Sequence, residues 1–455
     1  MAVLQPGVVS LPVGNRQFLS DLQMLDRHFS KEFVEKFGNQ NYHTVLNLLG
    51  KKVKINGRDF YHHESRGKIQ PKVSVNAQIT APAAGADVTV TLQAGDHFNG
   101  GTQSPIRVGE VVRISTSGIE GKIVSMSKAV NNAHTATIRP LQSGQAFVSA
   151  GSANLLAGEL LMLMGVTEAG ERSSAPDPQF NLTEKVSNTT TEVRDVMRLT
   201  DRNMIERLEF EYNGQQYFKY KGMKDTQLRF LNDVEFKLMF GDIANNLGAV
   251  GGSVGTQGVI PRVRQGGTTI TYTPGSLGIP DIQTLTRTAL FNGGPTEYHG
   301  LTDIYLRQEF NNELFSQYGA GAINYGSVGG SEEMMVSYGF KGMYMDGFSI
   351  FLKTYSPFSP EAVVGAVPAT GTPEFRNFGL FLAQGSMTDP QSKQTLPNIR
   401  VVYNAVENEP EIKSWESGAY ASVPNGEVAE LAVHWICYPG IELMGTAQNI
   451  ILESA

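Results

Sequence analysis

The chain has 455 residues, of which 40% are hydrophobic and 18% charged, and 49 are glycine. This length allows two or three packed units, and this balance excludes a chain that is disordered throughout. The formal net charge is −7, whereas a dedicated nucleic-acid-binding domain usually has a basic balance. The first 70 residues carry ten Lys or Arg against six Asp or Glu, a balance that suits either a basic segment or an ordinary solvated surface.

The single cysteine, Cys437, excludes an intramolecular disulfide and a zinc site built on cysteines. It lies in the apolar run 433–438, so we predict a small buried hydrophobic side chain rather than a nucleophile. The N-terminal residues lack the pattern of a signal peptide, and no stretch reaches about 18 apolar residues. We therefore expect synthesis in a reducing cytoplasm and no contact with a membrane.

The first 80 residues change character twice. Residues 1–15 hold two prolines and two glycines, which predicts an extended arm. Between residues 18 and 37, apolar side chains recur every three or four positions, which predicts a helix that ends at Gly38. Residues 53–80 then mix apolar and charged side chains, which predicts a long extended excursion with two exposed faces.

Residues 81–165 are rich in Ala, Gly, Val, Thr and Ser. Short β runs at 88–92, 111–114, 121–126 and 135–138 are separated by turn residues, which is typical of a small all-β module. The pattern does not choose between a barrel and a sandwich.

The remainder of the chain mixes helices and strands. From residue 191, apolar residues at helical spacing predict a helix, which is interrupted by the polar pair Asn213 and Gly214. The spacing resumes over 227–240 and predicts the longest amphipathic helix, the spine of a domain. Residues 245–280 are glycine-rich and predict a mobile loop with one β run at 268–273.

Two helices and a series of strands follow. Asp281 is predicted to cap a helix through residue 290, and Thr302 or Asp303 another helix from residue 304. Strands are predicted at 335–340, 348–352, 378–382, 399–403, 428–438 and 448–452. This order of elements predicts an α+β fold, with helices beside a sheet.

No motif for catalysis or cofactor binding is found in the sequence. It lacks a phosphate-binding loop, a dinucleotide fingerprint and a nucleophile elbow. His62, His63 and Glu64 cluster, but neighbouring side chains on a strand point to opposite faces, which disfavours a shared metal ion. We therefore predict no catalytic, cofactor-binding or metal-binding residues, and no enzyme; a hydrolase would need carboxylates that converge in a pocket.

The order of segments, more than any one motif, carries a resemblance to a known family. Residues 53–75 look like the outgoing strand of a long loop, 177–212 its return leg, 227–240 a spine helix, 335–358 inner strands and 435–452 a closing strand. This order resembles the Hong Kong 97-like capsid fold of the major capsid proteins of tailed bacteriophages. The resemblance implies five regions: an N-terminal arm and helix (1–45), extension-loop strands (46–80 and 166–200), an inserted small all-β module (81–165), a peripheral domain with the spine helix (201–245 and 430–455), and an axial domain with the remaining peripheral strands (246–429).

The resemblance also implies a function. We expect a major capsid protein that self-assembles into hexamers and pentamers and so forms an icosahedral shell around phage double-stranded DNA, which it contacts without sequence specificity. Assembly would take place in the cytoplasm of the host bacterium, with portal, separate scaffolding and decoration proteins as partners, and a crAss-like phage of gut Bacteroidetes as a source. Alternatives are an encapsulin-type nanocompartment shell and another virion structural protein.

The same resemblance suggests where neighbouring copies would touch. The charged residues of the extension loop are expected to pair across the interface between subunits: Arg58, Asp59, Glu64, Arg66 and Lys68. The simpler structural alternative is an exposed hairpin whose charges are solvated.

Overall fold

The computed structural model describes residues 51–65, 72–96, 106–127, 134–166, 183–200, 211–212, 215–243, 255–318, 342–359, 361, 373–388, 395–406, 409–421 and 429–454. The chain divides into two compact units. We call them the body, made of Met1–His62 and Ser187–Ala455, and the β unit, made of His63–Val186. The helix predicted over 18–37 and the strand predicted over 335–340 lie outside the described residues.

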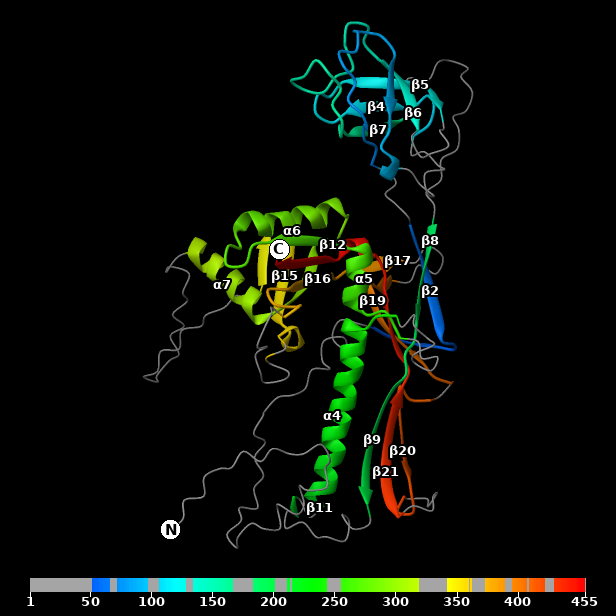
Figure 1. The fold of residues 1–455 in the computed structure, drawn as a ribbon, viewed down its shortest axis with the longest axis vertical. Coiled ribbons are helices and arrows are strands. Elements are labelled where there is room, and N and C mark those ends of the chain that lie inside the picture. The colour runs from blue at the N-terminus through cyan, green and yellow to red at the C-terminus, as the bar shows by residue number, and fades with distance from the viewer. Residues whose placement is uncertain are drawn as a thin grey trace. The chain divides into compact units, whose positions relative to one another are not determined.

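The β unit is built on a five-stranded antiparallel sheet with the strand order β3-β6-β5-β4-β7 (Figure 1). In its first strand, Val88 and Val90 are buried and alternate with threonines that are more exposed, the period that lets a sheet bury one face. All four β runs predicted in this region form strands, whereas β7 was not predicted. The elements are β3 (Val88–Thr91), η1 (Ala94–Asp96), β4 (Val111–Ile114), β5 (Glu120–Ser127), β6 (Thr135–Pro140) and β7 (Leu161–Gly165).

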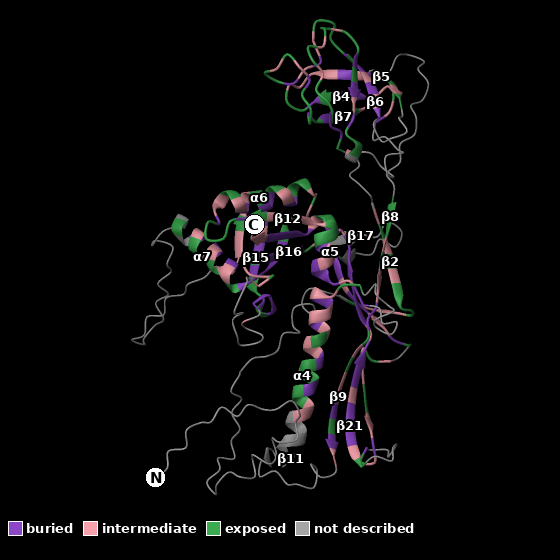
Figure 2. Ribbon diagram, viewed as in Figure 1, coloured by how far each residue is buried: buried purple, intermediate pink, exposed green. Residues whose placement is uncertain are grey.

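The core of the β unit includes residues that we predicted to be part of the extended excursion. Val73 and Val75 are buried in the core of this sheet. Figure 2 shows buried residues along its strands. Isolated bridges tie the same segment to the unit: Ser74 to Leu160, Val75 to Leu92, and Ile79 to Leu155. The predicted boundary at residue 80 was therefore wrong, because the partners of this segment lie up to about 90 residues along the chain, where no local pattern reveals them.

In the body, the helix α4 (Tyr217–Phe240) lies along a three-stranded antiparallel sheet with the order β20-β21-β9 (Figure 1). Phe230 of the helix is fully buried against Val433, Trp435 and Met197 of the sheet. The helix predicted over 227–240 is confirmed, although it begins earlier, at Tyr217. The strands are β9 (Val193–Thr200), β20 (Ile412–Ser417) and β21 (Glu430–Cys437).

The helix predicted from residue 191 was wrong, because residues 193–200 form the strand β9. Val193, Met197 and Leu199 lie on the same face of the strand and belong to the core that contains Phe230 of α4. Val196 lies on the opposite face. The same apolar residues also fit a helical spacing, so the local pattern was ambiguous. Pairing along the whole length of β21 decided in favour of the strand.

A short antiparallel hairpin precedes α4. Its strands are β10 (Glu211–Tyr212) and β11 (Gln215–Gln216). The two residues between them in sequence are Asn213 and Gly214, a pair favoured in two-residue hairpin loops because both positions require positive φ. The polar break that we predicted at this pair falls in sequence between the two paired strands, and the pair itself lies outside the described residues.

The largest sheet of the body has six strands in the order β12-β23-β16-β13-β15-β14, and the helices α6 and α7 contribute to the core on one of its faces. Asp303 directly precedes α7, as predicted, whereas α6 begins two residues before the predicted cap Asp281, which lies in its first turn and bonds back to the N-cap residue Gly278. Asp281 accepts a hydrogen bond from the Gly278 amide (2.9 Å), and Asp303 accepts one from the Ile304 amide (2.6 Å). The elements are β12 (Thr268–Tyr272), α6 (Ile279–Phe291), β13 (Glu297–Thr302), α7 (Ile304–Tyr318), β14 (Gly342–Met345), β15 (Phe348–Thr354), η4 (Ser356–Phe358), β16 (Gly379–Ala383), η5 (Thr446–Gln448) and β23 (Ile450–Ser454).

The helix α5 (Val259–Gly266) corrects the loop that we predicted over 245–280. Val259, Ile260 and Val263 lie on one side of this helix and are buried in the core shared with the end of α4. Only eight residues long, the helix gave too short a pattern among its glycine-rich neighbours to be predicted. The β run predicted over 268–273 is confirmed as β12.

A second three-stranded sheet has the order β1-β19-β22, in which β1 runs parallel to β19 and β22 antiparallel to it. Because β1 pairs within the body, the predicted excursion does not begin at residue 53. The strands are β1 (Lys51–Ile55), β19 (Ile399–Asn404) and β22 (Pro439–Leu443), and a small separate pair is formed by β17 (Ser386–Thr388) and β18 (Thr395–Pro397).

The mixture of helices beside sheets confirms the α+β class that we predicted. One prediction differs from the structure. We grouped all of residues 430–455 with the spine helix. The strand β23 instead pairs with β12 and β16 in the six-stranded sheet. The closing segment of the chain therefore contributes strands to three sheets of the body, through β21, β22 and β23.

Candidate functional site

The arm is a two-stranded ribbon formed by β2 (Asp59–Ser65) and β8 (Thr183–Thr189). No residue of the arm whose burial is described is buried, and Tyr61 is 58% exposed. The division between the body and the β unit falls inside this ribbon. An isolated two-stranded ribbon is only marginally stable in water, so the arm needs contacts with other parts of the protein or with another molecule.

The five residues that we predicted to contact neighbouring copies belong to the arm or adjoin it in sequence. Arg58 and Asp59 are exposed, and Glu64 is half-buried. Arg66 and Lys68 lie outside the described residues. Pairing of these charges with another copy stays a prediction.

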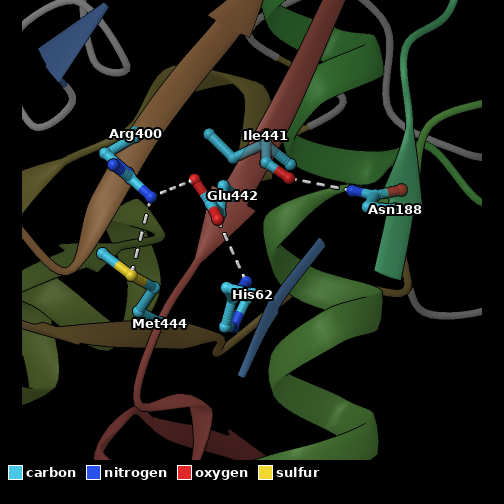
Figure 3. Close-up of polar contacts among 6 residues, drawn as sticks. All are labelled: His62, Asn188, Arg400, Ile441, Glu442 and Met444. Carbon is cyan, nitrogen blue, oxygen red and sulfur yellow. Dashed lines mark hydrogen bonds and ion pairs between the residues drawn. The ribbon is translucent and has the colours of Figure 1, made fainter. Parts of the chain in front are cut away.

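The arm meets the body at a group of polar contacts that we call the arm root (Figure 3). It consists of His62 and Asn188 from the arm, and of Arg400, Glu442 and the main chain at Ile441 from the body. The body residues come from two neighbouring strands, because Arg400 lies on β19 and is paired in register with Glu442 on β22.

Asn188 attaches the returning strand of the arm. Its side-chain amide donates hydrogen bonds to the carbonyl oxygens of Ile441 (2.8 Å) and Gln257 (3.0 Å), and its Oδ1 accepts one from the Gln257 amide (2.9 Å). One side chain thereby satisfies main-chain groups from two separate parts of the body. Buried main-chain groups need such partners, so this attachment is structural and does not titrate.

The residues after Asn188 attach the two strands to each other and to β22. The Thr190 amide donates to the carbonyl oxygen of Arg58 (2.9 Å), and the Thr191 amide donates to that of Pro439 (2.8 Å). At the same place Gly440 leaves room for the ring of Phe60, since a Cβ there would lie 2.8 Å from the ring. Close packing therefore requires glycine at position 440.

Glu442 is the charged centre of the arm root, with a side chain only 7% exposed. Its Oε1 lies 3.1 Å from His62 Nδ1, and its Oε2 lies 2.6 Å from a guanidinium nitrogen of Arg400. Burial by itself would raise the pKa of this carboxyl group, but the hydrogen bond from His62 and the positive charge of Arg400 outweigh burial and hold the pKa below its ordinary range. The carboxylate is therefore ionised at neutral pH.

The remaining titratable groups that drew attention in the sequence show no catalytic arrangement. Cys437 is buried, and burial raises the pKa of its thiol to about 12, so it is protonated at neutral pH, as expected of a core side chain. Within the described part of the chain, no three His, Cys, Asp or Glu side chains are grouped so that they could hold a metal ion. None of the helices described is both long enough and apolar enough to cross a bilayer.

Sequence reasoning singled out His62 but missed its partners. Glu442 offered a signal, because it is a lone charge in the otherwise apolar run 439–445, and a buried charge needs a partner. Its partner Arg400 had a similar signal in the strand predicted over 399–403. Asn188 offered none, since an asparagine among threonines in a loop-like segment is ordinary.

No protein-family model matches this sequence, and neither does any curated protein. Among solved structures, the chain is similar to one from Mycobacterium phage Ogopogo, with 12% identity, a TM-score of 0.42 and coverage of 96% of this chain and 98% of that one. It is similar to a capsid chain of the cyanophage P-SCSP1u, with 9% identity, a TM-score of 0.39 and coverage of 95% of this chain and 94% of that one. It is also similar to a chain of the SrpI encapsulin complex of Synechococcus elongatus, with 8% identity, a TM-score of 0.39 and coverage of 95% of this chain and 94% of that one. Likenesses this distant carry no argument about function.

Proposed function

We propose that this protein is a shell-forming structural subunit, the major capsid protein of a tailed bacteriophage with a Hong Kong 97-like fold. The observation that carries the proposal is the arm, a ribbon of two strands with no buried residue among those whose burial is described. Such a ribbon lacks a core of its own, so it gains stability when it lies on a second molecule. The proposed second molecule is a neighbouring copy of this chain.

The arm is suited to a repeated contact between identical subunits. Charges of both signs lie on it or directly precede it in sequence, including Asp59 and Arg58, and the ring of Tyr61 is exposed. One exposed ion pair contributes only about 0–1 kcal/mol. A closed shell repeats the contact many times, and this multiplicity stabilises an assembly whose single contacts are weak.

The other parts of the chain take the roles that the resemblance gives them, with bounds adjusted to the structure. Helix α4 is the proposed spine of the peripheral domain, and β2 with β8 forms the proposed extension loop. The β unit is the proposed insertion within that loop. The six-stranded sheet with α6 and α7 belongs to the proposed axial domain, where subunits of hexamers and pentamers would meet.

This function implies partners and a location rather than a reaction. The subunits would assemble in the bacterial cytoplasm around a scaffolding protein, join a portal and decoration proteins, and become part of the virion, with a crAss-like phage as the proposed source. Contact with packaged DNA would be electrostatic and non-specific. No catalytic group is required.

Electron microscopy of the full chain, expressed alone and with a candidate scaffolding protein, tests the proposal. We expect closed shells, tubes, or rings of five and six subunits. The variant Arg58→Glu should reduce assembly, whereas the control Arg113→Glu, which reverses an exposed charge on β4 of the β unit, should leave it unchanged. A monodisperse monomer under both expression conditions would refute the proposal, and shells that form without enclosing DNA in an infected cell would favour an encapsulin-type compartment.

A further inference from the structure

The contacts of the arm root differ in their response to pH. Asn188, Thr190 and Thr191 use amide and hydroxyl groups, which do not titrate in the range where proteins are stable. The contact between His62 and Glu442 joins an imidazole to a carboxylate. It links the outgoing strand β2 to β22, whereas Asn188 links the returning strand β8 to the same strand.

We infer that the contact between His62 and Glu442 is a pH-dependent latch that holds the base of the outgoing arm strand on the body. Its closed form has a protonated His62 beside an ionised Glu442, and its weakened form has a neutral imidazole. Histidine titrates near neutral pH, with an ordinary pKa of about 6.5, so the latch would respond in the physiological range. The latch is a property of the single chain and does not require assembly.

The charges around His62 determine the sign of the response. Glu442 faces it from β22, and Arg400 lies behind Glu442 on β19. Along β2, Glu64 lies two residues further on the same face, and β8 carries Glu184 and Lys185, whose charges are opposite. The charged residues that β2 and β8 contribute are therefore of both signs.

Arg400 opposes the protonation of His62, but less strongly than Glu442 favours it. The imidazole and the guanidinium contact different oxygens of the carboxylate and approach it from different sides (Figure 3). Each cation is thus nearer to the anion than to the other cation, and Coulomb energies fall with distance. Protonation also converts the hydrogen bond to a charge-assisted one, which is the stronger kind.

The pH window follows from linkage. If the closed latch holds the proton on His62 more tightly than the open form does, its contribution is complete at low pH and is lost as pH rises through the range in which the imidazole releases its proton. The lower limit is set by Glu442, whose pKa is depressed by His62 and Arg400 against the effect of burial, so that it stays ionised in mildly acidic solution. The latch should therefore be strongest between about pH 5 and pH 6.

Hydrogen–deuterium exchange of the full chain from pH 5.5 to 8.0, corrected for intrinsic exchange rates, tests the latch. We expect peptides over 59–65 and 183–191 to be about fivefold better protected at pH 5.5 than at pH 8.0, a change equivalent to about 1 kcal/mol. The variant His62→Gln, which cannot be protonated, should remove this pH dependence. The control His63→Gln, at the adjacent exposed position of β2, should retain it.

Peptides from β13 and β16 report whether each variant keeps the fold of the body, and light scattering of the same samples reports association. Protection of the arm that does not vary with pH in the wild type would overturn the inference. So would a pH dependence that survives in His62→Gln or disappears in His63→Gln. None of these results depends on whether shells form, so failure of the latch and failure of the proposed assembly can be told apart.

Discussion

Two groups of strands in this chain have opposite relations to a core. The sheet β20-β21-β9 buries one face under helix α4, where Phe230, Trp435 and Met197 are among the side chains removed from water. The arm of β2 and β8 has no residue described as buried, and it is tied to the body at its root by named polar contacts. The first group is stabilised inside the chain, whereas the second has exposed faces to which a partner can bind.

The largest expected effect on stability comes from weakening the core between helix α4 and the sheet β20-β21-β9. Phe230→Ala removes a fully buried ring between α4 and the sheet, and should destabilise the body by about 3–5 kcal/mol. The two tryptophans, Trp415 and Trp435, lie in this sheet, so urea unfolding followed by their fluorescence measures the change. An unchanged midpoint would show that the helix does not stabilise the sheet.

The next effect concerns the base of the arm. Asn188→Ala leaves the main-chain groups of Gln257 and Ile441 without their partner, at a cost of about 2 kcal/mol. Hydrogen exchange should show the loss mainly in residues 183–191 rather than across the body. Ser187→Ala, at the exposed neighbouring position of β8, is the matched control and should change little.

A smaller effect is expected from crowding the same place. Gly440→Ala puts a Cβ 2.8 Å from the Phe60 ring and should destabilise the arm root by about 1–2 kcal/mol. A shorter side chain opposite should restore stability, so the double variant Gly440→Ala with Phe60→Leu is predicted to melt at a higher temperature than Gly440→Ala alone. If both melt alike, Phe60 does not limit this position.

The smallest effect on stability is expected in the arm itself. Tyr61→Ser removes a ring that is 58% exposed, and should change the unfolding free energy of the isolated chain by no more than about 0.5 kcal/mol. Its effect should instead appear in assembly, measured by sedimentation velocity at increasing protein concentration. A large loss of stability without a change in assembly would show that the arm packs on its own chain.

Much of the secondary structure could be predicted because its cause is local. The strands at 88–92 and 135–138 alternate apolar and polar residues, Asp303 directly precedes α7, and Asp281 lies in the first turn of α6. The spine helix was predicted because its apolar spacing continues over several turns. In each case the determining residues lie within a few positions of one another.

The remaining elements depend on pairing between distant parts of the chain. Residues 193–200 fit either a helix or a strand, and pairing with β21, more than 200 residues away, made them a strand. The arm root likewise brings His62 to Glu442 and Asn188 to Ile441 across most of the chain. The apolar run around Glu442 indicates, without any structure, that this residue needs a partner, because a charge in an apolar strand must be compensated. Which side chain supplies that partner depends on how distant strands come to lie together, and no local pattern encodes it.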